Sequence, residues 1–118
     1  MPNPKQTALA KLSSLKISIF NAMAELEIHA ETALAAGRQD EHTAMMLKLG
    51  ELGRSARKIR DAEDKIRASM PIADTISALD DVAAQARTTL KRLKKTADVL
   101  EEIATLIKIV GNLSTILT

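Results

Sequence analysis

Two histidines, His29 and His42, are the only side chains in this chain that titrate near neutral pH, so any acid–base or metal chemistry would begin with them. Glu25 and His29 stand four residues apart, a spacing that places two metal ligands on one face of a helix. The next positions on that face are Thr32 and Ala33, which supply no third ligand. His42 follows two acidic residues in QDEHTAMM and fits a solvated position in the first turn of a helix. We therefore expect no metal site.

The chain also lacks the parts of a nucleophilic catalytic site. It has no Cys, and none of its serines stands at a recognisable spacing from a base. Its four glycines, Gly37, Gly50, Gly53 and Gly111, form no cluster that can hold a phosphate. We therefore expect a protein that is not an enzyme, with no cofactor and no small-molecule substrate.

Basic residues gather in two short clusters, one around Arg54 and one around Arg87. If the chain folds back on itself between them, the two clusters come together as one positive patch that can meet phosphates. The candidate anion-binding residues are Arg54, Arg57, Lys58, Arg87 and Lys91. The other interpretation is a solvated face, because acidic residues follow both clusters. The net charge is only +2, and a single Phe cannot form a base-stacking platform, so nucleic-acid binding is an alternative function and not the main expectation.

The elements that position these residues are predicted to be helices. Phe20 is the only aromatic residue, and the chain is rich in Ala, Leu, Ile, Lys and Glu, which favour helices over strands. Gly37 follows a long helical pattern, as the residue after a helix end often does, and Pro71 cannot continue a helix. These two breaks predict helices at about 5–36, 40–69 and 72–110 and a tail at 111–118, all in one domain.

The apolar residues of these segments repeat with alternating steps of four and three, most regularly over 45–70 and 72–107. A repeat of 3.5 residues produces left-handed supercoiling of packed helices. Because both connections are short, we expect consecutive helices to be antiparallel neighbours. The predicted fold is all-α, an antiparallel three-helix bundle with left-handed, coiled-coil-like packing and a C-terminal helical extension.

Three residues of the second helix depart from a plain apolar row. Glu63 places a charge in it, and a charge in a tight helix contact needs a partner. The candidates for that partner are Ser13, Ser14 and Lys16 of the first helix. Gly50 and Gly53 lie inside the helix, where they either let two helices approach closely or weaken the helix by about 1 kcal/mol each.

A second apolar row begins near the C-terminal end, again with steps of four and three. It consists of Val99, Ile103, Leu106, Val110, Leu113 and Leu117. At 1.5 Å per residue the third helix would be about 58 Å long and the first two about 45 Å, so its last turns would have no neighbour. We therefore expect these six residues to bind a second copy or another helical protein. The expected function is a non-enzymatic protein-interaction or self-assembly module.

Two alternatives for this C-terminal segment stay open. Its longest uncharged run, 109–118, is too short to span a bilayer, which needs about 20 apolar residues. It could instead lie flat on a membrane surface, as amphipathic helices do, which would make the protein membrane-active. It could also bend at Gly111 and cover the open end of its own bundle.

The first 24 residues have a faint outline of a secretory signal. Lys5, Lys11 and Lys16 precede a short apolar stretch, and no acidic residue accompanies them. The helical periodicity continues past Ala24 without a break, however, so the sequence favours a cytoplasmic protein over a secreted one.

Overall fold

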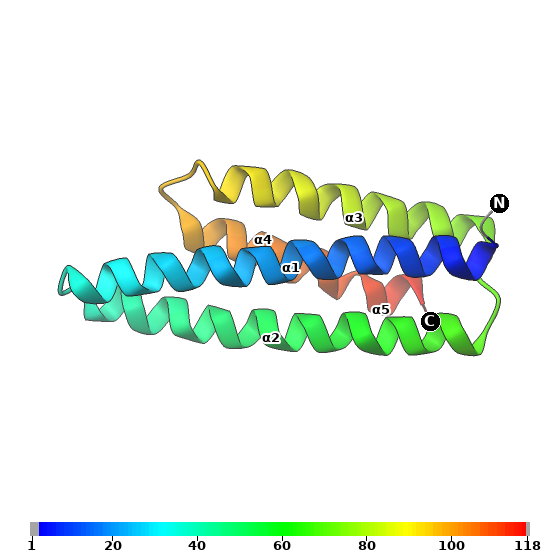
Figure 1. The fold of residues 1–118 in the computed structure, drawn as a ribbon, viewed down its shortest axis with the longest axis horizontal. Helices are drawn as coiled ribbons and strands as arrows, with labels where there is room; N and C mark the ends of the chain where they lie inside the picture. The colour runs from blue at the N-terminus through cyan, green and yellow to red at the C-terminus, as the bar shows by residue number, and fades with distance from the viewer. Residues whose placement is uncertain (1–2, 118) are drawn as a thin grey trace.

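The computed structural model describes residues 3–117, and over this range the chain forms helices and no strands. In chain order they are α1 (Pro4–Ala35), α2 (Gln39–Ala68), α3 (Ala73–Leu93), α4 (Val99–Gly111) and the short α5 (Leu113–Ile116). The all-α prediction is confirmed. The long helices are four in number, and they pack together in one bundle (Figure 1).

The continuous third helix predicted over 72–110 is wrong. The chain leaves the helix after Leu93, turns, and returns as α4. Two side-chain hydrogen bonds stabilise the N-terminus of α4. Thr96 Oγ1 accepts a hydrogen bond from the Asp98 amide at 3.0 Å, and Asp98 Oδ1 accepts one from the Glu101 amide at 3.3 Å. Asp98 is thus the N-cap of α4, and it satisfies an amide that the first turn of a helix would otherwise leave unpaired.

The four helices form a ring in which α1 packs against α2 and α3, and α4 packs against the same two helices. Among the described residues, α2 and α3 make no contact with each other, so they lie diagonally across the bundle. The expectation that consecutive helices are neighbours is therefore wrong for this pair. In the connection at 69–72, Ser69 and Ile72 have extended backbone, and the chain crosses the end of the bundle there.

Helix ends follow the local chemistry of the sequence. At the start of α1, Asn3 and Gln6 form a reciprocal capping box, with side-chain-to-amide distances of 2.8 and 3.0 Å, and Pro4 occupies the first helical position. At its end, Gly37 has a φ of 78°, a conformation that favours glycine, and the Arg38 amide donates to the Ala33 carbonyl at 2.8 Å. The predicted break at Gly37 is confirmed.

The core is an apolar column contributed by all four long helices. Its largest fully buried side chains are Leu12, Leu15, Ile19, Leu26, Leu52, Ile59, Ile66, Leu79, Leu93, Ile103, Leu106 and Val110. Gly50 and Gly53 are not points of close approach, because a Cβ atom placed on either meets no heavy atom within 4 Å outside its own helix. Of the two interpretations of these glycines, the close approach of two helices is therefore wrong.

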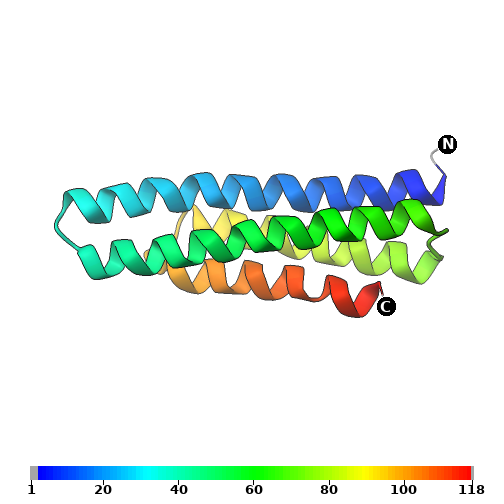
Figure 2. The ribbon, with the colours of Figure 1, turned by 90° about the horizontal axis from the view of Figure 1, so that it is seen from below.

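The helices differ in length, and the difference leaves one end of the bundle uncovered. α1 has 32 residues and α2 has 30, whereas α3 has 21 and α4 has 13. Both views show the α1–α2 turn reaching well beyond the α3–α4 connection (Figures 1 and 2). We call the α1–α2 turn and the adjoining helix ends, defined as residues 27–47, the hairpin tip. The unpartnered length therefore lies at the α1–α2 turn and not at the C-terminus, where the sequence had placed it.

Candidate interaction surfaces

The six residues predicted to bind a partner lie inside the bundle or against it. Val99, Ile103, Leu106, Val110 and Leu113 are at most 4% exposed, and Leu117 is partly buried. They are covered by α2 and α3, the two neighbours of α4. The row is thus a core row of the same chain and offers no open surface to a partner. Of the alternatives, cover by the chain's own bundle agrees with this placement. The chain reverses direction at 94–98, and the predicted interruption at Gly111 is also present, because α4 ends there and the short α5 that follows packs against α2 and α3.

The structure does not bring the two basic clusters together. Arg54, Arg57 and Lys58 are exposed on α2, and Arg87 and Lys91 are exposed on α3. Because α2 and α3 lie diagonally, the composite patch expected from folding at Pro71 is not formed. The α2 cluster is itself divided between two neighbours.

The division follows from the helix faces. Arg57 borders a groove toward Lys16 and Phe20 of α1, while Lys58 borders a small pocket next to Leu113 of α5. The α2 cations therefore point to opposite sides of their own helix. Only the α3 pair, Arg87 and Lys91, shares one site.

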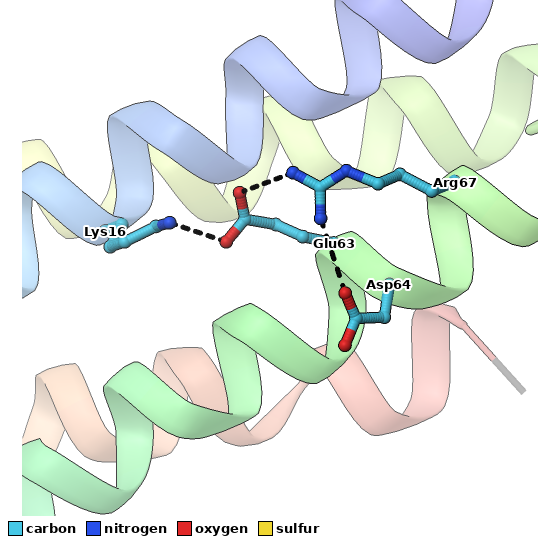
Figure 3. A network of polar contacts seen from close by, with 4 residues as sticks. All are labelled: Lys16, Glu63, Asp64 and Arg67. Atoms are coloured by element: carbon cyan, nitrogen blue, oxygen red, sulfur yellow. Dashed lines mark hydrogen bonds and ion pairs between the residues drawn. The ribbon is translucent and has the colours of Figure 1, made fainter.

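Glu63 has the partner that the sequence suggested. Its carboxylate lies 2.6 Å from Lys16 Nζ across the α1–α2 contact, and its side chain is only 9% exposed (Figure 3). Arg67, one turn further along α2, lies 3.8 Å from the other carboxylate oxygen and 3.3 Å from Asp64. The charge in the apolar row is therefore paired, as a buried carboxylate requires.

The two histidines and the acidic residues show no metal-binding arrangement. His29 on α1 and His42 on α2 are each partly buried, so His42 is less exposed than a fully solvated position. Within residues 3–117, no three side chains of His, Cys, Asp or Glu are grouped so that they could hold a metal ion. Over the same residues, none of the helices has the length and apolar character needed to cross a bilayer.

Two carboxyl groups have shifted pKa values, each from a local contact. The ion pair with Lys11, 2.8 Å away, lowers the pKa of Asp80. A side-chain hydrogen bond with Asp98, together with the charge of that carboxylate, raises the pKa of Glu101. Both groups lie at the surface of the bundle.

A groove between α1 and α3 was not predicted from the sequence. Its volume is about 530 Å³. The residues that line it are Ala10, Ser13, Ser14, Ile17, Ser18, Asn21, Arg87, Leu90, Lys91 and Lys94. Arg87 and Lys91 were predicted to bind anions, but beside α2, whereas they lie beside α1. The overlooked signal was the row of small residues at every fourth position of α1, which leaves room beside the long α3 side chains.

The hairpin tip is the second surface with a distinct composition. It exposes four large apolar side chains, Ile28, Leu34, Met46 and Leu47, at 46–69%. It carries four carboxylates, on Glu27, Glu31, Asp40 and Glu41, against one cation on Arg38. Sequence analysis had missed this surface because it assumed that α1 and α2 were covered along their whole length.

No family model, curated protein or solved structure matches this chain. Its activity therefore has to be inferred from these two surfaces and from the chemistry of their residues.

Proposed function

We propose that this protein is a non-enzymatic, helical self-assembly module that binds further copies of itself through the hairpin tip. The observation that carries the proposal is the exposure of Ile28, Leu34, Met46 and Leu47 near the α1–α2 turn, which projects beyond the α3–α4 connection (Figures 1 and 2). Along the rest of their length the same two helices pack against α3 and α4, and the large apolar side chains exposed there are Ile17 and Phe20 of α1.

Burial of the exposed apolar side chains of the tip would favour association. Full burial of a Leu, Ile or Met side chain contributes about 1.5–3 kcal/mol, and these four are about half exposed or more. Their combined burial is therefore worth several kcal/mol, against an association cost on the order of 4–15 kcal/mol. The balance predicts weak association that depends on concentration.

The charge distribution favours contact between the tip of one copy and the side of another. The tip is acidic, while the chain as a whole has a net charge of +2, so the remaining residues carry all of the positive surplus. The acidic tips of two copies would repel each other, whereas the tip of one copy and the positively charged side of another would attract each other. Such a head-to-side contact uses two different surfaces. It forms open chains of copies, unless the rotation between successive copies closes the chain into a ring.

The packing within the bundle belongs to the same proposal. The 3.5-residue apolar repeat supports left-handed, coiled-coil-like packing of the helices, with crossing angles near 20°. The membrane-surface function was based on the apolar row of α4, which packs in the core, and the nucleic-acid function on a patch that α2 and α3 do not form together. No observation favours either of them over self-assembly.

Light scattering and sedimentation velocity over a range of protein concentrations test the proposal. We expect the average mass to rise with concentration at low salt and to fall as salt screens the charges, since the Debye length is about 10 Å at 0.1 M. The double variant Ile28→Ser, Leu47→Ser should remove most of this rise. The matched control is Met70→Ser, Ile72→Ser, which changes two side chains that are 64% and 65% exposed but lie between α2 and α3.

Circular dichroism should show unchanged helicity in both variants, because all four side chains are exposed. A wild-type protein that stays monomeric at every concentration would contradict the proposal. So would a control variant that loses association as strongly as the tip variant, because apolar contacts would then not be confined to the tip.

A further inference from the structure

The groove between α1 and α3 exists because the two helices present side chains of very different size to each other. Ala10, Ser14 and Ser18 follow one another at every fourth position of α1 and therefore share one face. Opposite them lie the long side chains of Arg87 and Lys91 of α3. The long side chains border the space left by the small ones without filling it.

The floor of this groove holds a hydroxyl that has no partner within the described residues. Ser18 is 3% exposed and lines the groove, and no hydrogen bond of its hydroxyl is found within residues 3–117. Ser18 is thus available to a molecule that enters the groove.

The charge of the groove has one sign. Three of its ten lining residues are cationic, Arg87, Lys91 and Lys94, and none is acidic. Arg87 Nη1 donates to Ser14 Oγ at 3.0 Å, which fixes its guanidinium at the rim. Within residues 3–117, Lys91 and Lys94 form no ion pair. An anion that reaches this rim meets two lysines with no competing carboxylate.

The same groove has an apolar side. Ile17 is more than half exposed, and Ala10 and Leu90 add aliphatic surface on either helix. From Ala10 to Asn21 the α1 wall is about 16 Å long, at 1.5 Å per residue. The groove volume of about 530 Å³ lies within the range of about 300–1,000 Å³ that is typical of small-molecule sites.

From these features we propose that the α1–α3 groove binds a single small anionic amphiphile, an aliphatic chain that ends in a carboxylate. The head group lies between Lys91 and Lys94, and the chain runs along Ile17 toward Ala10. The hydroxyl of Ser18 faces the ligand from the floor. This site is separate from the hairpin tip, so the inference does not depend on self-assembly.

The test is a titration of the full-length protein with sodium decanoate below its micelle concentration, followed by amide chemical shifts and by calorimetry. We expect shifts confined to residues 10–21 and 87–94. Three probes separate the parts of the ligand: decanol has the chain without the charge, acetate has the charge without the chain, and decyltrimethylammonium reverses the charge. Each should bind at least about tenfold more weakly than decanoate.

Variants then test which residues make the site. Lys91→Gln, Lys94→Gln should weaken decanoate binding by about tenfold or more. The charge-matched control, Arg54→Gln, Arg57→Gln, removes two exposed cations of α2 and should leave the affinity unchanged. Ala10→Leu fills the apolar end of the groove from an exposed position, so it should weaken binding without altering any charge.

Several results would overturn the inference. Equal affinity for decanol and decanoate would mean that the lysines do not recognise the carboxylate head group. Equal loss in the α2 control would mean general attraction of anions to a cationic surface. Binding to vesicles of equal parts phosphatidylcholine and phosphatidylglycerol, with no binding of free decanoate, would mean that the protein meets a membrane surface and not a single amphiphile.

Discussion

Removing the cation that faces Glu63 is the most direct perturbation of the α1–α2 contact. In Lys16→Met the aliphatic stem of the side chain remains, so the packing against α2 is kept while the charge is lost. The carboxylate of Glu63 is then left 9% exposed, with only Arg67 nearby at 3.8 Å. That distance is too long for a hydrogen bond, so Glu63 keeps a charge in the helix contact without a close donor.

The magnitude follows from the burial of the acceptor. A hydrogen bond to a charged, buried group contributes about 1.5–3 kcal/mol, whereas an exposed ion pair contributes about 0.2–1 kcal/mol. Lys16 is one-third exposed, so its own charge is partly screened and the upper end of the range is not reached. We expect Lys16→Met to lower the free energy of unfolding by about 2 kcal/mol.

The chain offers a closely matched control on the same helix. Lys11 pairs with Asp80 at 2.8 Å, and its side chain is 35% exposed, compared with 33% for Lys16. The difference lies in the acceptor, because the Asp80 side chain is 51% exposed. Lys11→Met should therefore cost less than about 1 kcal/mol. Urea unfolding followed by circular dichroism at constant pH and salt measures both changes.

A second substitution separates pairing from packing. If the cost in Lys16→Met comes from an unpaired carboxylate, then adding Glu63→Leu should recover most of the stability, because it replaces a lone buried charge with an apolar side chain. The coupling energy between the two sites should be about 1–2 kcal/mol. Equal costs for the Lys16 and Lys11 variants, or no recovery in the double variant, would refute the reasoning.

Further predictions concern the core, the backbone and pH. Leu106→Ala should cost about 2–5 kcal/mol in urea unfolding, because Leu106 is fully buried. In thermal melts, Gly37→Ala should destabilise by about 1 kcal/mol or more, since φ is 78°, whereas Gly50→Ala should stabilise by about 0.5–1 kcal/mol in an open helical site. Asp98 raises the pKa of Glu101 in the folded state, so ionisation of Glu101 opposes folding. Glu101→Gln should therefore be more stable than wild type at pH 7, and the difference should vanish below the ordinary pKa of 4.5 in urea midpoints measured against pH.

Local signals in the sequence were enough to predict the first two helices. Gly37 marks their connection, and the apolar steps of four and three identify the buried faces of both. Lys16 was among the three partners proposed for Glu63, because an antiparallel hairpin with a short turn has little freedom in its register. Contacts that depend on one tight turn can be derived from spacing alone.

Contacts between distant helices could not be derived in this way. The connection at 69–72 is only one residue longer than the first one, yet within the described residues α3 packs against α1 and does not contact α2. The packing of all four helices, and not the loop, determines which helices are neighbours and which lie diagonally opposite each other. For this reason Arg87 and Lys91 were assigned to a patch with α2, whereas they border a groove with α1.

The break between α3 and α4 was detectable, and the signal lay in the phase of the apolar rows. The row of the third predicted helix is buried from Leu79 to Leu93, but beyond it Ala97 is exposed. The buried row of α4 is the second one, which begins at Val99 and continues through Ile103. Two rows on one helix would form an unusually wide stripe, whereas two rows that follow one another in the chain are the buried faces of two helices. The N-cap at Asp98 stands where the phase changes, so a change of row next to a capping residue marks a new helix.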